Sequence, residues 1–268
     1  MSEVEEVISE ESGSEEDSDW EEWADDEDEV VVEEEVDLED ALSLAGAVKL
    51  ASVQDQGNFW ERPRGVKKII IIYYSLFGNL GIMADEIKRG IQSQECCEAF
   101  IYQVEEIYPR EFLEKINATS SYTYSHPVLT RTEVRHFPEA DGFVFGVSSR
   151  MGSVPAPMKS FFESTGGLWL KGALIGKAAG IFTSTPSQSA GSETTALSLI
   201  TLFAHHGMMF VPLPAVGHSR DRNQIESMSP FGSNCITGID GIKTPSIIER
   251  KIAMRQGRYF AQTVNRIV

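Results

Sequence analysis

Three short segments combine hydroxyl side chains with small residues, so each could hold a ligand. They read SLFGNL at 75–80, SSRMG at 148–152 and STPSQSAG at 184–191. The first contains no Lys or Arg, yet the Ser75 hydroxyl, backbone N–H groups and the start of a following helix can bind phosphate without a cation. Such a site suits the monophosphate of FMN better than the polyphosphate of ATP, which usually comes with Mg²⁺ and a lysine. From this segment alone, an ordinary turn between a strand and a helix is an equal alternative.

The elements that must position these segments alternate along the chain. Continuous apolar runs rich in β-branched residues predict strands buried on both faces, at 66–74, 99–104, 142–147, 177–184 and 208–213. Neither GxGxxG nor GxxxxGK[ST] occurs. Strands that alternate with helices predict an α/β fold, with a five-stranded parallel sheet doubly wound by helices on both faces. Ligands bind such sheets at the carboxyl ends of the strands, where all three segments fall.

Four helices are predicted from apolar spacing and end signals. The first follows Asn79 as N-cap, with Asp85 and Glu86 early and Gly90 near its end. The second, PAPMKSFFESTGG, is opened by proline and stopped by glycines. The third runs over 192–207, and the last begins with the capping box Ser246-x-x-Glu249.

Charge is unevenly distributed in this 268-residue chain of formal net charge −18. Residues 1–40 contain 22 acidic residues and no Lys or Arg, which leaves 19 acidic against 23 basic residues in the remainder. Dense like charge with few apolar residues predicts that residues 1 to about 60 form a disordered tail, before a folded domain at 66–268. We interpret the tail as a solvating spacer that repels nucleic acid, or as an arm for a protein partner.

The cysteine pattern and the apolar runs bear on the protein's compartment. Three cysteines, of which Cys96 and Cys97 are adjacent, give neither an even disulfide framework nor metal-ligand spacing. This predicts no metal site and a reduced setting, which is cytoplasmic, with a nuclear location or one peripheral to a membrane as alternatives. The segment ALSLAGAVKLA is too short to span a bilayer, and no basic-then-apolar signal opens the sequence. No transmembrane segment is expected.

Longer stretches carry a family resemblance. YYSLFGNLGIMADEI resembles the flavodoxin-type FMN signature. FGVSSRMGSVPAPMKSFFESTGGLWLKGALIGKAAGIF and LFAHHGMMFVPL, with the later SPFG and GIDG, resemble the WrbA-like flavodoxin-fold NAD(P)H:quinone oxidoreductases, including flavodoxin-like proteins of fungal type. The resemblance covers roughly 66–268 and is most specific in TGGLW and AHHG. It implies a flavodoxin-like fold, with the acidic tail as an addition.

The resemblance also implies site residues. The FMN phosphate loop falls on Ser75, Leu76, Phe77, Gly78, Asn79 and Leu80. The loop flanking the isoalloxazine ring falls on Ser149, Arg150 and Met151. The second flavin loop falls on Ser184, Thr185, Pro186, Ser187, Gln188 and Ser189. His205 corresponds to the flavin-contacting histidine, and Trp169 to a wall of a quinone pocket between subunits of a homodimer or homotetramer. The structural alternatives are an interface aromatic for Trp169, a helix end for His205 and a surface charge for Arg150.

The function implied is two-electron reduction of quinones by NADH or NADPH through FMN, which protects against oxidative stress and demands no general base from the protein. The sequence departs from the family mainly at Pro186 and Gln188, where glycines are usual. Proline lacks the N–H that could approach the flavin ring, which leaves weaker FMN binding as an open alternative. The alternative is a flavodoxin-like scaffold with little or no flavin that acts through oligomerisation and partners. An electron-transfer flavodoxin is a third interpretation.

Overall fold

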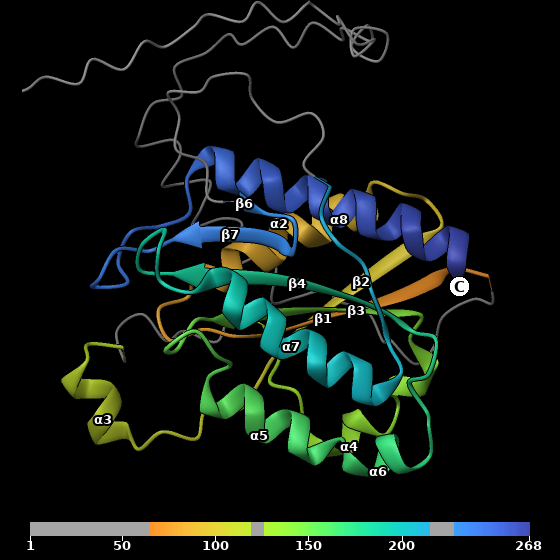
Figure 1. The fold of residues 1–268 in the computed structure, drawn as a ribbon, viewed down its shortest axis with the longest axis horizontal. Helices are drawn as coiled ribbons and strands as arrows, with labels where there is room; N and C mark the ends of the chain where they lie inside the picture. The colour runs from red at the N-terminus through yellow and green to blue at the C-terminus, as the bar shows by residue number, and fades with distance from the viewer. Residues whose placement is uncertain (1–64, 119–125, 215–227) are drawn as a thin grey trace, which may run out of the picture. The chain divides into compact units, whose positions relative to one another are not determined.

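The computed structural model describes residues 65–118, 126–214 and 228–268, and the predictions about the acidic tail lie outside these residues. Its sheet has the strand order β2-β1-β3-β4-β7-β6, and β5 also pairs with β4 (Figure 1). All pairs are parallel except β6 with β7. The strands are β1 Lys67–Tyr74, β2 Cys97–Gln103, β3 Gly142–Ser148, β4 Ala178–Thr185, β5 Met209–Phe210, β6 Met228–Ser229 and β7 Gly232–Ile236.

The fifth position of the parallel sheet is divided between two strands. The strand predicted at 208–213 is only β5, which pairs with the start of β4 at Ala178 and Ala179. The end of β4 pairs instead with β7, whose sequence GSNCI was not predicted as a strand. Because β7 buries the polar side chains of Ser233 and Asn234, it lacks the apolar run that marks a buried strand.

Helices cover both faces of the sheet, as the sequence predicts (Figure 1). Helices α2 and α8 pack on one face, while α5 and α7 pack on the other. Among the described residues, no helix combines the length and apolar character that crossing a membrane requires. The helices are α2 Asn79–Gln92, α3 Arg110–Lys115, α4 Arg131–Val134, the 3₁₀ helix η3 Phe137–Glu139, α5 Ala156–Ser164, α6 Gly166–Leu170, α7 Ser192–His206 and α8 Ile247–Ile267.

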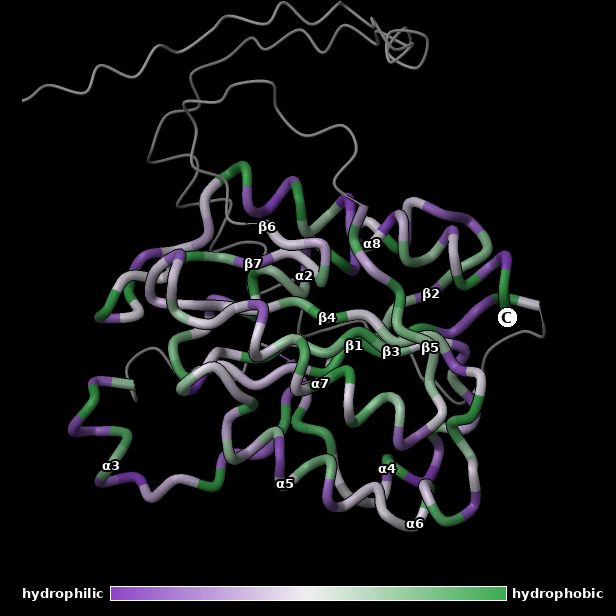
Figure 2. Tube along the Cα trace, viewed as in Figure 1, coloured by the Kyte–Doolittle hydropathy of each residue, from purple (hydrophilic) through white to green (hydrophobic). Residues whose placement is uncertain are grey.

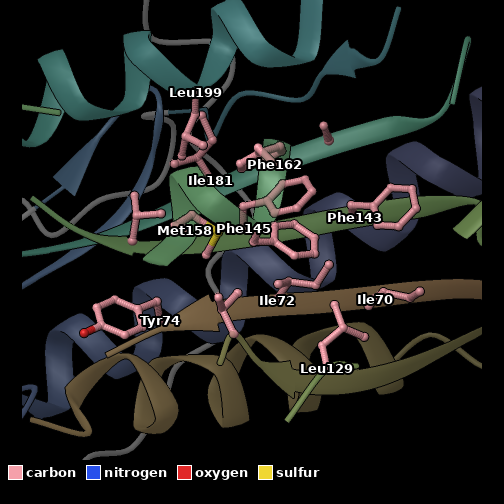
Figure 3. Packing of buried hydrophobic residues seen from close by; sticks show 14 of the residues in the cluster. Ile70, Ile72, Tyr74, Leu129, Phe143, Phe145, Met158, Phe162, Ile181 and Leu199 are labelled. Carbon is pink, nitrogen blue, oxygen red and sulfur yellow. The ribbon is translucent and has the colours of Figure 1, made fainter. Parts of the chain in front are cut away.

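The isoleucine run of β1 contributes side chains to the hydrophobic cores on both faces of the sheet. Ile69 and Ile71 face α2 and α8, whereas Ile70 and Ile72 face α5 and α7, because successive side chains of a strand point to opposite faces. Figure 3 shows Ile72 near Phe145 and Ile70 near Phe143, which both belong to β3. In Figure 2 the central strands are mainly hydrophobic, whereas α8 alternates between hydrophobic and hydrophilic residues. Burial on both faces fixes the central strands and therefore the edge where the loops emerge.

Two helix predictions were wrong in detail. The N-cap of α2 is Gly78 in the left-handed region at φ 82°, not Asn79, and its first turn contains no acidic residue, since Asp85 and Glu86 lie mid-helix. The glycines at 166 and 167 do not stop a helix but begin α6. In contrast, the capping box of Ser246 with Glu249 and the stop of α7 at Gly207 are confirmed.

Candidate functional site

The three hydroxyl-rich segments meet at one edge of the sheet. They follow β1, β3 and β4, which are neighbours in the sheet and parallel. The Ser148 hydroxyl donates to the Tyr74 carbonyl at 3.5 Å, and the Ser149 N–H donates to the Ser184 carbonyl at 2.9 Å. The loops therefore form one continuous surface at the carboxyl ends of the strands, the place where open α/β sheets bind ligands.

The loop after β1 is built to receive an anion. The Ser75 side chain is buried, and its hydroxyl accepts a hydrogen bond from the Leu80 N–H at 3.4 Å. Within the described part of the chain, the N–H groups of Phe77, Gly78 and Asn79 have no hydrogen-bond acceptor. These N–H groups and the positive end of the α2 dipole fit the phosphate of FMN without a cationic side chain.

A fourth segment, which site prediction missed, covers this loop. After β7, the carbonyl of Gly241 accepts a hydrogen bond from the Asn79 side-chain amide at 2.8 Å. Gly241 has φ 74°, and a Cβ there would lie 2.4 Å from the Phe77 ring. The only sequence signal was GIDG, seen as part of the resemblance. Asn79 is therefore a tether between two loops rather than a helix cap.

The loop after β3 is a tight turn that projects from the sheet. Arg150 and Ser153 exchange backbone hydrogen bonds of 3.0 and 2.9 Å. The tip carries Met151 at φ 53° and Gly152 at φ 71°, and the Met151 side chain is fully exposed. A non-glycine residue in the left-handed region is strained, and such strain is concentrated at ligand sites. Arg150 is exposed beside it.

The Ser149 hydroxyl joins this turn to the loop after β4. It donates to the Ala190 carbonyl at 2.9 Å and lies 2.9 Å from the Thr195 hydroxyl. A Cβ on Gly191 would lie 2.8 Å from the Gly152 Cα, so the two loops are in close backbone contact. Ser149 therefore holds the loops together rather than pointing an unused hydroxyl at a ligand.

The predicted second flavin loop divides into a buried and an exposed half. Ser184 and Thr185 are buried in β4, where the Asn234 side-chain amide donates to the Thr185 hydroxyl at 3.1 Å. The remaining residues of the loop are exposed: Pro186, Ser187, Gln188 and Ser189. The exposed half is the part of this loop whose side chains face solution.

Trp169 and His205 are not brought to this edge within one chain. Helices α5 and α7 run back against the strand direction, so α6 and the end of α7 lie where the strands begin (Figure 1). The backbone bond from Gly176 N–H to the Gly207 carbonyl, 2.9 Å, joins the ends of these segments just before β4. Trp169 is 51% exposed and His205 is exposed. Either could reach a flavin only in another copy of the chain.

The neighbouring His206 is buried, unlike His205. Its Nε2 lies 2.9 Å from the Thr165 hydroxyl. Burial, and secondarily the nearby His205, lowers the pKa of His206 below its usual value of 6.5. The histidine that the structure fixes is therefore the second of the pair.

We expect the lowered pKa of His206 to make the protein less stable in mild acid. Above the unfolded-state pKa of about 6.5, both states are neutral at this residue. As pH falls below that value, the unfolded chain binds a proton before the folded chain does, so stability is lost until the lower folded pKa has been passed. The urea midpoint of unfolding should be measured at about pH 7.5 and at about pH 5. Between these two pH values it should fall less for His206→Gln than for the wild-type protein. Parallel curves would contradict the expectation.

The order of the sheet, with ligand loops after β1, β3 and β4, defines a flavodoxin-like α/β protein. A flavodoxin-type, WrbA-like protein from Agrobacterium tumefaciens shares this fold, with a TM-score of 0.53 and 16% identity over 75% of this chain and 99% of that chain. The chain belongs to the family of NADPH-dependent FMN reductases, which matches residues 68–222.

Relatives with quinone oxidoreductase names match about three quarters of this chain. A quinone oxidoreductase of Triphysaria versicolor is 43% identical over 202 residues, which is 75% of this chain and 96% of that protein. An NAD(P)H quinone oxidoreductase of Candida albicans is 38% identical over 202 residues, or 74% of this chain and 98% of the relative. An NAD(P)H dehydrogenase (quinone) of Aromatoleum aromaticum is 38% identical over 203 residues, 75% and 97% of the two chains.

Proposed function

We propose that this protein is an FMN-dependent oxidoreductase that transfers two electrons from NADH or NADPH to a quinone. The observation that carries the proposal is the anion cradle at 75–80, in which the N–H groups of Phe77, Gly78 and Asn79 have no acceptor in the described part of the chain. Membership of the FMN reductase family and the names of the relatives support the same activity. Transfer of both electrons together avoids one-electron-reduced quinone, so a protective role in oxidative stress is part of the proposal.

Bound FMN would supply the hydride and electron transfer, while the protein binds and orients it. The Ser75 hydroxyl and the amides of 77–79 would hold the phosphate. The turn of Arg150 and Met151 and the exposed residues 186–189 would flank the ring. None of these residues carries a carboxylate, and the proposed reaction needs no general base from them.

A homodimer or homotetramer is part of the proposal. Trp169, Leu170 and Ile175 expose apolar side chains at the edge where the strands begin. A second copy could cover this surface and bring Trp169 and His205 to the flavin edge of its neighbour. We also propose a cytoplasmic location, since Cys96, Cys97 and Cys235 are free thiols.

The test is the flavin content of the purified full-length protein. We expect a yellow protein with bound FMN that NADPH bleaches without oxygen and that benzoquinone then restores. A variant that lacks residues 1–60 should behave in the same way, because the proposed domain is 66–268. A colourless protein that takes up no added FMN would contradict the proposal.

A scaffold with little or no flavin is the second candidate. It is favoured by Pro186, an exposed residue without an N–H at the loop expected to meet the ring. The same preparation distinguishes the candidates, because a scaffold would form oligomers without binding FMN.

A further inference from the structure

The hydrogen bond between Thr165 and His206 can be assigned a direction. The Thr165 hydroxyl donates its one proton to the Phe162 carbonyl at 2.6 Å. The same oxygen lies 2.9 Å from His206 Nε2. Because a hydroxyl has a single proton, it must accept from the imidazole. His206 therefore carries its proton on Nε2.

The other ring nitrogen of His206, Nδ1, is buried and makes no hydrogen bond to the part of the chain that the structure describes. A proton there would have no acceptor, and a buried donor without an acceptor costs about 1–3 kcal/mol. The surroundings therefore favour the single form in which Nε2 donates and Nδ1 is bare.

Thr165 connects His206 to Trp169, because it is hydrogen-bonded to both residues. Its carbonyl accepts hydrogen bonds from the N–H groups of Leu168 at 2.9 Å and Trp169 at 3.1 Å, which form the first turn of α6. That helix has only five residues and begins with Gly166 and Gly167. Two glycines and so short a length make a helix unstable by itself. Its position therefore depends on contacts with neighbouring segments, which include the packing of Leu168 on the core and the bonds to Thr165.

We propose that His206 is a positioning residue for quinone binding: by donating from Nε2 to Thr165, it fixes the start of α6 and hence the place of the Trp169 ring. The role in quinone binding rests on the proposed function, in which Trp169 lines the pocket of a neighbouring copy. The fixing of α6 itself does not, and the two parts can be measured separately.

The test uses variants that differ only in where they place a donor. His206→Gln puts an amide N–H near the position of Nε2, whereas His206→Asn puts one near Nδ1 and His206→Leu has none. In the full-length holoenzyme, loss of the buried bond should raise the KM for benzoquinone up to about tenfold in the Asn and Leu variants. The kcat should be unchanged, and Gln should restore the wild-type KM.

Fluorescence of Trp169 gives a readout that needs no activity. The chain has four tryptophans, so Trp20, Trp23 and Trp60 are replaced by Phe in every variant. Leu and Asn at 206 should increase quenching of Trp169 by acrylamide, and Gln should not. If the enzyme shows no quinone reduction at all, the proposed function fails. The difference in Trp169 quenching between the Gln variant and the Leu and Asn variants would still support the fixing of α6.

Substitutions at Thr165 test the same hydrogen bond and do not depend on how the His206 variants fold. Thr165→Val should reproduce the defect of His206→Leu, and Thr165→Ser should not, because serine retains the hydroxyl. Combining Thr165→Val with His206→Leu should add no further rise in KM, as expected for one shared interaction. Equal behaviour of the Val and Ser variants, or of Gln and Asn at 206, would overturn the proposal. So would a change in Trp169 quenching without a change in KM in an active enzyme.

Discussion

Replacing Ser75 by Asp should lower the affinity for FMN by at least about 100-fold while changing the affinity for riboflavin little. The new carboxylate would stand at the buried position that faces the anion cradle. Two like charges about 4 Å apart near a protein surface repel by about 4 kcal/mol, which corresponds to more than a 100-fold loss. Riboflavin lacks the phosphate, so it does not meet this repulsion. Fluorescence titration of the apoprotein with each ligand measures the difference.

Two control variants separate the phosphate loop from the ring loop. Ser75→Thr retains the hydroxyl and should bind both ligands nearly as the wild type does. Pro186→Gly should tighten both ligands, because it restores a backbone N–H at the exposed loop after β4. An equal loss of FMN and riboflavin affinity in Ser75→Asp would show that the loop after β1 does not bind the phosphate.

Replacing Gly257 by Ala should destabilise the domain by about 3 kcal/mol or more, a large effect for adding one methyl group. A Cβ at Gly257 would lie 2.0 Å from the Ile87 carbonyl oxygen of α2. From the other side, a Cβ at Gly90 would lie 1.9 Å from the Met254 carbonyl oxygen of α8. Both obstacles are backbone atoms, so no side chain can move aside and the helices must separate. Urea unfolding of Gly257→Ala and Gly90→Ala measures the loss.

Gly167→Ala is the matched control. A Cβ at Gly167 would meet nothing within 4 Å, and the residue is also helical. Alanine there should stabilise the protein by about 0.5–1 kcal/mol, because it is the better helix former. If all three alanine variants lost similar stability, close approach of α2 and α8 would not be the cause.

The sequence predicted well wherever one local signal was decisive. The isoleucines of β1 and the pair Ser246 and Glu249 gave a buried strand and a helix start that the structure confirms. It failed where a contact from elsewhere decided the outcome. Strand β7 carries buried polar residues, and Asn234 in it is satisfied by Thr183 and Thr185 of β4, about fifty residues earlier. No local pattern contains such a partner.

Taken alone, the sequence determined the α/β alternation and the edge where the hydroxyl-rich loops meet, and it predicted a phosphate loop without cations, because periodicity and loop composition are local properties. Tertiary structure decided which residues belong to that edge. It placed the Gly241 carbonyl on Asn79 across 162 positions of the chain. It also put Trp169 and His205 at the opposite edge, because helices that return to begin a new parallel strand carry their last residues back to where the strands start.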